Sequence, residues 1–130
     1  MRNFILVIFL VVLTTSCDLN GYGPKVQTGG VEVYYKPNEL KNQAQSLSVL
    51  LDSLEYGKNG TVSFQVIKDS IINLKMVTDP TYYSDTSMDY ALNAMSIISQ
   101  IEIFKDESVQ FHICDETFNV KRSLEVIKNE

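Results

Sequence analysis

Apolar and polar residues alternate in four stretches of the chain, and an alternation with a period of two is typical of a strand with one buried face. These stretches cover residues 31–35, 62–67, 72–76 and 109–114. The middle two are separated by a short polar segment at 68–70, so we expect them to form a hairpin. A further short strand is expected at 124–127.

Two other stretches repeat apolar residues with the spacing of a helix. After Asn38, the repeats come at steps of four and three residues, and Gly57 ends the pattern. Thr86 and Asp89 then resemble a capping box at the start of a second helix. We expect the apolar stripe of each helix to face the core; the stripes are Leu40, Ala44, Leu47, Leu51 and Leu54 in the first helix, and Met88, Ala91, Leu92, Met95, Ile98 and Ile101 in the second.

The predicted elements follow one another as strand, helix, strand, strand, helix, strand. This order resembles the split βαβ, or ferredoxin-like, pattern of α+β proteins. The resemblance implies an antiparallel sheet with both helices on one face, and a last strand that lies beside the first. We therefore expect residues 31–130 to form a single α+β domain whose second sheet face is open.

The first residues carry a different signal. Arg2 precedes an apolar run at 4–13 that is too short for a bilayer span of roughly 20 residues, which indicates a secretory signal peptide. The junction LTTSC at 13–17 resembles the lipobox of bacterial lipoproteins, with Thr14 where that motif usually has leucine. The resemblance implies removal of residues 1–16, acyl chains such as palmitate on Cys17, and an anchor in the bacterial cell envelope. The alternatives are an ordinary cleaved signal with an incidental cysteine, or a short buried helix.

Residues 17–30 contain four glycines, one asparagine and one proline, and show no periodicity. We expect a flexible tether there, with a strand at 25–27 as the alternative. Two or three acyl chains on Cys17 would make a stable anchor, because each buried CH₂ group contributes about 0.8 kcal/mol.

Composition narrows the range of partners. The chain has eleven Lys and Arg residues against sixteen Asp and Glu residues, a net charge of −5 at pH 7, and no cluster of basic residues. A nucleic-acid partner is therefore not expected. With Cys17 lipidated, Cys114 would be the remaining thiol and no intrachain disulfide could form. No cofactor is predicted.

The sequence FHICDE at 111–116 contains the single histidine of the chain and one of its two cysteines. Strand alternation places His112 and Cys114 on the open face, about 6.5 Å apart at a rise of roughly 3.3 Å per residue. In the ferredoxin-like order, Glu32 and Tyr34 would be their neighbours. A histidine at that distance could lower the pKa of the thiol, so a thiol-dependent enzyme that uses Cys114 and His112 is one hypothesis.

Several features of the sequence oppose that hypothesis. No glycine-rich turn adjoins Cys114 to form an oxyanion hole, and there is no second histidine. A metal site of His112, Cys114 and Glu32 would lack the clustered ligand pairs of zinc motifs, so we expect no metal. We therefore favour a non-catalytic protein that binds an envelope protein or another envelope component through the open sheet face. The predicted binding face consists of Glu32, Tyr34, Gln65, Asn73, Gln110 and His112.

Overall fold

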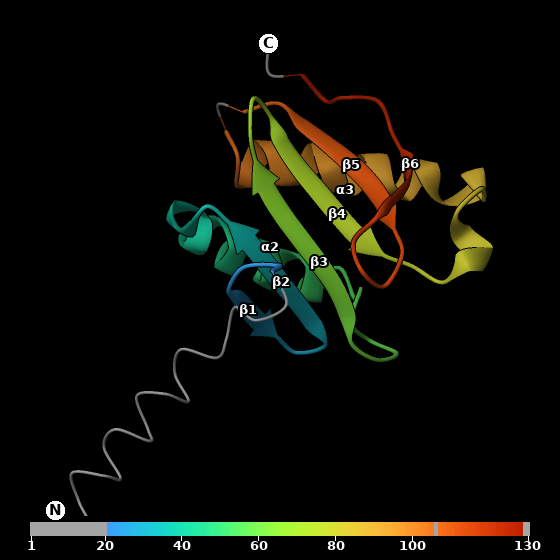
Figure 1. Cartoon of the computed structure of the whole chain (residues 1–130), viewed down its shortest axis with the longest axis horizontal. Helices are drawn as coiled ribbons and strands as arrows, with labels where there is room; N and C mark the ends of the chain where they lie inside the picture. The colour runs from blue at the N-terminus through green and yellow to red at the C-terminus, as the bar shows by residue number, and fades with distance from the viewer. Residues whose placement is uncertain (1–20, 106, 129–130) are drawn as a thin grey trace, which may run out of the picture.

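A computed structural model of the chain describes residues 21–105 and 107–128, so the predicted signal peptide and Cys17 lie outside the described residues. Six strands form one sheet, in which they keep their order along the chain (Figure 1). The helix α2 (Lys41–Ser53) connects β2 to β3, and α3 (Asp89–Glu102) connects β4 to β5. The strands are β1 (Lys25–Thr28), β2 (Val31–Lys36), β3 (Val62–Lys68), β4 (Ile72–Val77), β5 (Val109–Cys114) and β6 (Val120–Ser123), and the short 3₁₀ turns are η2 (Asn38–Leu40), η3 (Pro80–Tyr82) and η4 (Thr86–Met88).

The sheet is mixed. β2 runs parallel to β3 and β4 runs parallel to β5, whereas the three other neighbouring pairs are antiparallel. The predicted α+β fold with two helices is confirmed, but the antiparallel sheet and the ferredoxin-like strand order are wrong. β5 lies between β4 and β6 and not beside β2, because each helix connects two strands that are direct neighbours.

In the first strand-helix-strand unit, a close contact between two glycines and a backbone hydrogen bond bring the chain back to the start of β2. Gly30, just before β2, lies so close to Gly57, just after α2, that a Cβ on Gly30 would come within 2.3 Å of the Gly57 oxygen. The oxygen of Gly30 also accepts a hydrogen bond of 2.8 Å from the amide of Val62 at the start of β3. β3 therefore begins directly beside β2, and no gap is left in which another strand could insert.

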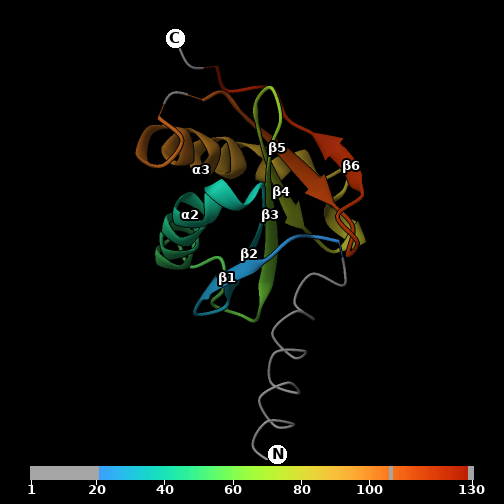
Figure 2. The ribbon, with the colours of Figure 1, turned by 60° about the vertical axis from the view of Figure 1, so that its left-hand side comes forward.

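Both helices cover the same face of the sheet, and the core fills the space between them and the strands (Figure 2). The strand alternation predicted this face correctly, since Val31, Val33, Phe111 and Ile113 are buried. In the first helix the predicted stripe is also confirmed, except that Leu54 lies beyond the end of α2 and is exposed. Each fully buried side chain of this size stabilises the fold by about 1.5–3 kcal/mol.

The helix α3 is rotated relative to the prediction. Leu92 and Met95 are buried as expected, but Ala91, Ile98 and Ile101 of the same predicted stripe are exposed. The residues that turn inward with Leu92 and Met95 are Ser96, Ser99 and Gln100. Both serine hydroxyls donate to backbone oxygens one turn earlier, and the Gln100 amide donates to two loop carbonyls, so these polar groups are buried with their hydrogen bonds made.

The two ends of the sheet also differ from the prediction. The expected tether of residues 17–30 is wrong for 25–28, because these residues form β1, which pairs with the free edge of β2 and packs Val26 against the core. Near the other end, the last strand is β6 at 120–123 and not 124–127, although Ile127 still exchanges two backbone hydrogen bonds with Val109. Within the described part of the chain, no helix is long and apolar enough to cross a bilayer.

Candidate functional site

His112 lies on β5 and is held by hydrogen bonds at both ring nitrogens. Its Nδ1 lies 2.7 Å from the hydroxyl of Ser123 on β6, and its Nε2 lies 2.8 Å from Oδ1 of Asn73 on β4. The amide nitrogen of Asn73 donates to Asp69, which fixes Oδ1 toward the imidazole. Nε2 must therefore carry the hydrogen, and Nδ1 accepts from Ser123 in the neutral ring.

The charge state of His112 agrees with this network. The side chain is 8% exposed, and burial is the main reason that its pKa lies below the ordinary value of 6.5. Lys75, its partner in β4, lowers the pKa further, while Asp69 opposes both effects. The imidazole is therefore neutral at pH 7 and takes part in a structural hydrogen-bond chain.

Cys114 is fully buried at the end of β5. Burial raises the pKa of its thiol to about 11, and the sulfur lies 3.9 Å from the backbone oxygen of His112. An activated nucleophile needs a lowered pKa and access to solvent, and this thiol has neither. The predicted proximity of the pair to Glu32 and Tyr34 is wrong, because β5 pairs with β4 and β6. Among the described residues, no group of three His, Cys, Asp or Glu side chains could hold a metal ion.

The predicted binding face is one continuous layer, but its polar groups already have partners within the domain. Glu32 accepts hydrogen bonds from Lys25 and Ser63, which outweigh burial and lower its pKa. The side-chain amides of Gln65 and Gln110 donate to the backbone oxygens of Tyr22 and Leu124, each at 3.0 Å. The side chain of Asn73 is hydrogen-bonded to His112 and Asp69.

An aromatic cluster covers part of the same face. Tyr22, Tyr34 and Phe118 make three mutual edge-to-face contacts, with ring centroids 5.0 to 5.8 Å apart. Tyr22 comes from the segment before β1 and Phe118 from the turn between β5 and β6, so two distant parts of the chain fold over the sheet. Most of the face that the sequence predicted to be open is therefore a second, internally bonded layer.

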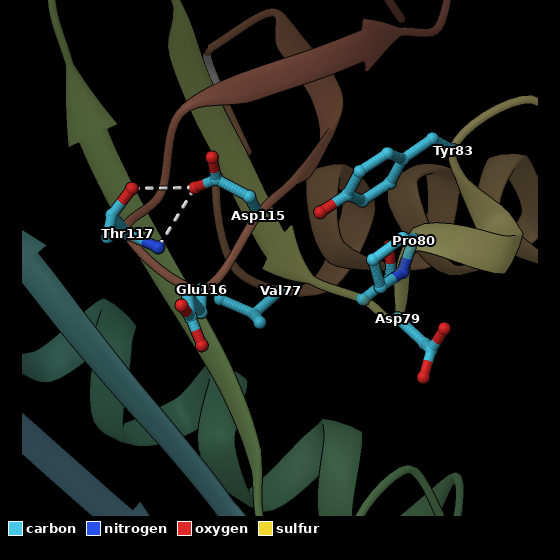
Figure 3. A pocket seen from close by; sticks show the side chains of 8 residues that line it. Val77, Asp79, Pro80, Tyr83, Asp115, Glu116 and Thr117 are labelled. Carbon is cyan, nitrogen blue, oxygen red and sulfur yellow. Dashed lines mark hydrogen bonds between the residues drawn. The ribbon is translucent and has the colours of Figure 1, made fainter.

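A pocket that the sequence did not predict lies at the carboxyl ends of β4 and β5 (Figure 3). These two strands are parallel, so the segments that follow them meet at the same edge of the sheet, where ligands of open α/β sheets commonly bind. The pocket has a volume of about 550 Å³. It is lined by Val77, Thr78, Asp79, Pro80, Tyr83, Asp115, Glu116 and Thr117.

The pocket is acidic because of Asp79, Asp115 and Glu116. One oxygen of Asp115 accepts hydrogen bonds from the hydroxyl and amide of Thr117 and from the amide of Asn119. The Thr117 hydroxyl is the main reason that the pKa of Asp115 lies below its ordinary value. A carboxyl acid of a hydrolase pair needs the opposite shift, so Asp115 is a fixed negative charge and not a proton donor.

Tyr83 supplies the aromatic wall of the pocket, with its hydroxyl directed inward (Figure 3). Burial, followed by the charges of Asp115, Asp79 and Glu116, raises the pKa of this hydroxyl, so it stays a hydrogen-bond donor. The ammonium group of Lys121, on β6, lies 3.8 Å from the second oxygen of Asp115 and 5.9 Å from the centroid of the Tyr83 ring.

Arg122 holds the loop that carries Tyr83. Its guanidinium donates to the backbone oxygens of Tyr83 and Asp85, at 2.8 and 3.1 Å, and to the carboxylate of Asp89 at 2.9 Å. This one side chain of β6 therefore fixes the loop after β4 and the start of α3. Arg122 acts as a positioning residue for the pocket.

Sequence reasoning missed this site for a physical reason. Acidic residues directly after two strands were a visible signal, but the predicted antiparallel order did not place residues 77–80 and 115–117 at one edge.

A scan of protein-family models finds no match to the chain, and neither the curated proteins nor the solved structures contain a significant match. The fold and the pocket thus define the class only as an α+β domain with a mixed six-stranded sheet.

Proposed function

We propose that the protein is a lipid-anchored protein of the bacterial cell envelope, whose α+β domain binds a cationic group of an envelope partner without catalysis. The anchor is supported by the charged, apolar and lipobox-like segments of residues 1–17. Because Tyr22 packs against Tyr34 and Phe118 of the domain, five residue steps separate Cys17 from the packed domain, a span of at most roughly 18 Å. An anchored domain would therefore lie close to the membrane surface.

The observation that carries the binding proposal is the position of Lys121. Its ammonium group lies 3.8 Å from the Asp115 carboxylate and 5.9 Å from the centroid of the Tyr83 ring, and both of these residues line the acidic pocket. This is the pair of contacts that recognises alkylammonium and guanidinium groups in proteins. The remaining acids, Asp79 and Glu116, leave an excess of negative charge for a second cation. The ligand class is a Lys or Arg side chain, or another envelope amine.

Absence of catalysis is supported by the state of the two residues that an enzyme would use. The Cys114 thiol is buried and protonated, and the imidazole of His112 is bound on both sides by Ser123 and Asn73. No observation favours the thiol-dependent enzyme over the binding domain.

The anchor is tested by growing cells with radiolabelled palmitate. We expect label on the wild-type protein and none on Cys17→Ala. An unlabelled wild-type protein that is recovered in soluble form would contradict the anchor.

The pocket is tested by following the NMR signals of the mature protein, in detergent, during titration with N-acetyl-lysine amide. The neutral N-acetyl-glutamine amide is the ligand control. We expect Asp115→Asn and Glu116→Gln to weaken lysine binding, since each removes one charge from the pocket. Asp85→Asn is the matched control, because Asp85 makes the same kind of hydrogen bonds with Ser87 but lies outside the pocket lining.

Lys121→Met is the most informative variant, because it removes the ammonium group that lies beside Asp115 and Tyr83. We expect this change to tighten the binding of the lysine amide. Equal affinities for the lysine and glutamine amides, or a weaker affinity in Lys121→Met, would contradict the proposed ligand class.

A further inference from the structure

The turn between β5 and β6 joins the acidic pocket to the segment that precedes β1. Asp115 and Thr117 of this turn line the pocket, whereas the next residue, Phe118, packs against Tyr22 with ring centroids 5.0 Å apart. Asp115 closes the turn, because its side chain accepts hydrogen bonds from the amides of Thr117 and Asn119. Figure 2 shows the start of the described chain, in blue, beside this turn. The pocket and the entry of the chain into the domain therefore share one fixed turn.

In an anchored protein, this shared turn keeps the pocket within reach of the membrane. The five residue steps from Cys17 to Tyr22 span at most roughly 18 Å. The ring contact between Tyr22 and Phe118 and one further residue then lead to the pocket lining at Thr117. The whole path is at most roughly 35 Å long, so the pocket can reach the head-group layer of the membrane that holds the anchor.

The pocket presents free negative charges beside a positive one. Asp79 and Glu116 are exposed acids of the lining. One oxygen of Asp79 accepts hydrogen bonds from the amide and hydroxyl of Thr81, and within the described part of the chain its other oxygen and the Glu116 carboxylate form no hydrogen bond or ion pair. At the margin, the ammonium group of Lys121 lies 3.8 Å from Asp115, and its side chain is 43% exposed. A ligand in this pocket therefore meets both signs of charge.

We propose that the pocket binds the phosphoethanolamine head group of a membrane lipid, with the ammonium group at Asp79 and Glu116 and the phosphate at Lys121. A primary ammonium group has three N–H bonds, which donate charge-assisted hydrogen bonds to carboxylates. The trimethylammonium group of a choline lipid has no N–H bond and cannot donate in this way. The inference rests on the proposed cation pocket and anchor, and it names the ligand of that pocket.

The position of Lys121 favours a head group over a peptide lysine. A ligand that has only a positive charge is repelled by the ammonium group of Lys121. In the head group, the phosphate follows the ammonium group after two carbon atoms, and its negative charge attracts the same lysine. The two charges of the head group therefore match Lys121 as well as the two acids.

Titration of the mature protein in a maltoside detergent, followed by NMR, tests the head-group chemistry. The probes are glycerophosphoethanolamine, ethanolamine and glycerophosphocholine. We expect glycerophosphoethanolamine to bind at least about threefold more tightly than each of the other two, which is the effect of one additional exposed charge pair or hydrogen bond.

Lys121→Met separates the contribution of the phosphate from that of the ammonium group. In this variant, glycerophosphoethanolamine should lose its advantage over ethanolamine, so that the ratio of the two affinities falls to about one, whereas Lys121→Arg should retain the advantage. Lys58→Met is the matched control, because Lys58 forms a similar ion pair of 3.9 Å with Glu55 outside the pocket lining. This control should leave the ratio unchanged.

Cross-linking in vesicles tests whether the head group belongs to a lipid. The acylated protein is placed in vesicles of phosphatidylethanolamine and phosphatidylglycerol and treated with a water-soluble carbodiimide, which joins an amine to a carboxylate in contact with it. We expect mass spectrometry to find a lipid adduct on the peptides that contain Asp79 or Glu116. Glu39 is the control and should stay unmodified, because it is exposed but follows β2 at the opposite end of the sheet.

Three outcomes would overturn the proposal. If N-acetyl-lysine amide binds but glycerophosphoethanolamine binds no more tightly than ethanolamine, the cation pocket stands and the head group is wrong. If neither the lysine amide nor glycerophosphoethanolamine changes the signals of the pocket, the proposed function fails as well. Equal lipid adducts on Glu39 and Glu116, or none on the acids of the pocket, would show that the pocket does not bind a lipid.

Discussion

Mild acid should destabilise this domain through His112. The folded state holds the imidazole neutral between Asn73 and Ser123, so its pKa lies below the ordinary value of 6.5, which the unfolded chain retains. Below pH 6.5 the unfolded state therefore binds a proton that the folded state does not. By linkage, the free energy of unfolding is unaffected by this group above pH 6.5 and falls as the pH is lowered from there toward the folded pKa.

The size of the effect follows from the one proton involved. In the window below pH 6.5, the free energy of unfolding should fall by up to about 1.4 kcal/mol per pH unit. For a domain of this size, a loss of 1 kcal/mol lowers Tm by roughly 4–8 °C. The carboxylates with lowered pKa, such as Asp69 and Asp115, lose their stabilising effect only near or below their ordinary values, and therefore in a more acidic range.

Urea unfolding measured by circular dichroism between pH 7.5 and 5 tests this expectation. His112→Gln is the matched variant, because a glutamine amide can donate to Asn73 and accept from Ser123 but does not titrate. We expect the slope between pH 6.5 and 5 to be reduced in His112→Gln. His112→Ala, which leaves both partners without a hydrogen bond in a buried site, should cost on the order of 3 kcal/mol at pH 7.5. If wild type and His112→Gln lose stability in parallel between pH 6.5 and 5, the neutral buried imidazole is refuted.

Three further predictions concern other residues. Maleimide should alkylate Cys114 in the native protein at pH 8 at least about a hundredfold more slowly than in urea, since a thiol with a pKa of about 11 is almost fully protonated. Cys114→Ser identifies the labelled site. Equal alkylation rates in the native and the unfolded protein would contradict the burial of this thiol. Arg122→Gln should lower the free energy of unfolding by about 2–4 kcal/mol and weaken ligand binding in the pocket, because three hydrogen bonds to the loop and α3 are lost. The control Lys121→Gln should change the free energy of unfolding by less than about 0.5 kcal/mol. Similar losses in both variants would refute the positioning role of Arg122. Gly30→Ala should lower the free energy of unfolding by more than about 2 kcal/mol, because the added Cβ would overlap Gly57. Gly60→Ala should lower it by less, because the space around Gly60 is open, although its φ is +139°. The reverse order in thermal unfolding would contradict the glycine contact.

The sequence determined the two helices and the four strands β2 to β5, with their order along the chain, and most of the core. Alternation placed Val31, Val33, Phe111 and Ile113 on the buried face, and it placed His112 on the face opposite these side chains. The leucine stripe of α2 was predictable because leucines at steps of four and three lie on one side of a helix, and that apolar side packs against the core. For residues 1–17, which lie outside the described residues, the sequence predicts a signal peptide, since the apolar run is too short to span a bilayer, and the lipobox-like junction predicts an anchor.

Only the tertiary structure decided which strands are neighbours. Strand pairing uses backbone N–H and C=O groups, which are the same at nearly every residue, so the side-chain pattern shows the face of a strand but not its partner. The hydrogen bond from Val62 to Gly30 starts β3 beside β2, and the parallel pair β4 and β5 brings Asp79, Tyr83 and Asp115 to one pocket. The side of α3 that faces the core was likewise decided only in the tertiary structure. Buried serines could turn inward because they bond their own helix, and this left the isoleucines outside.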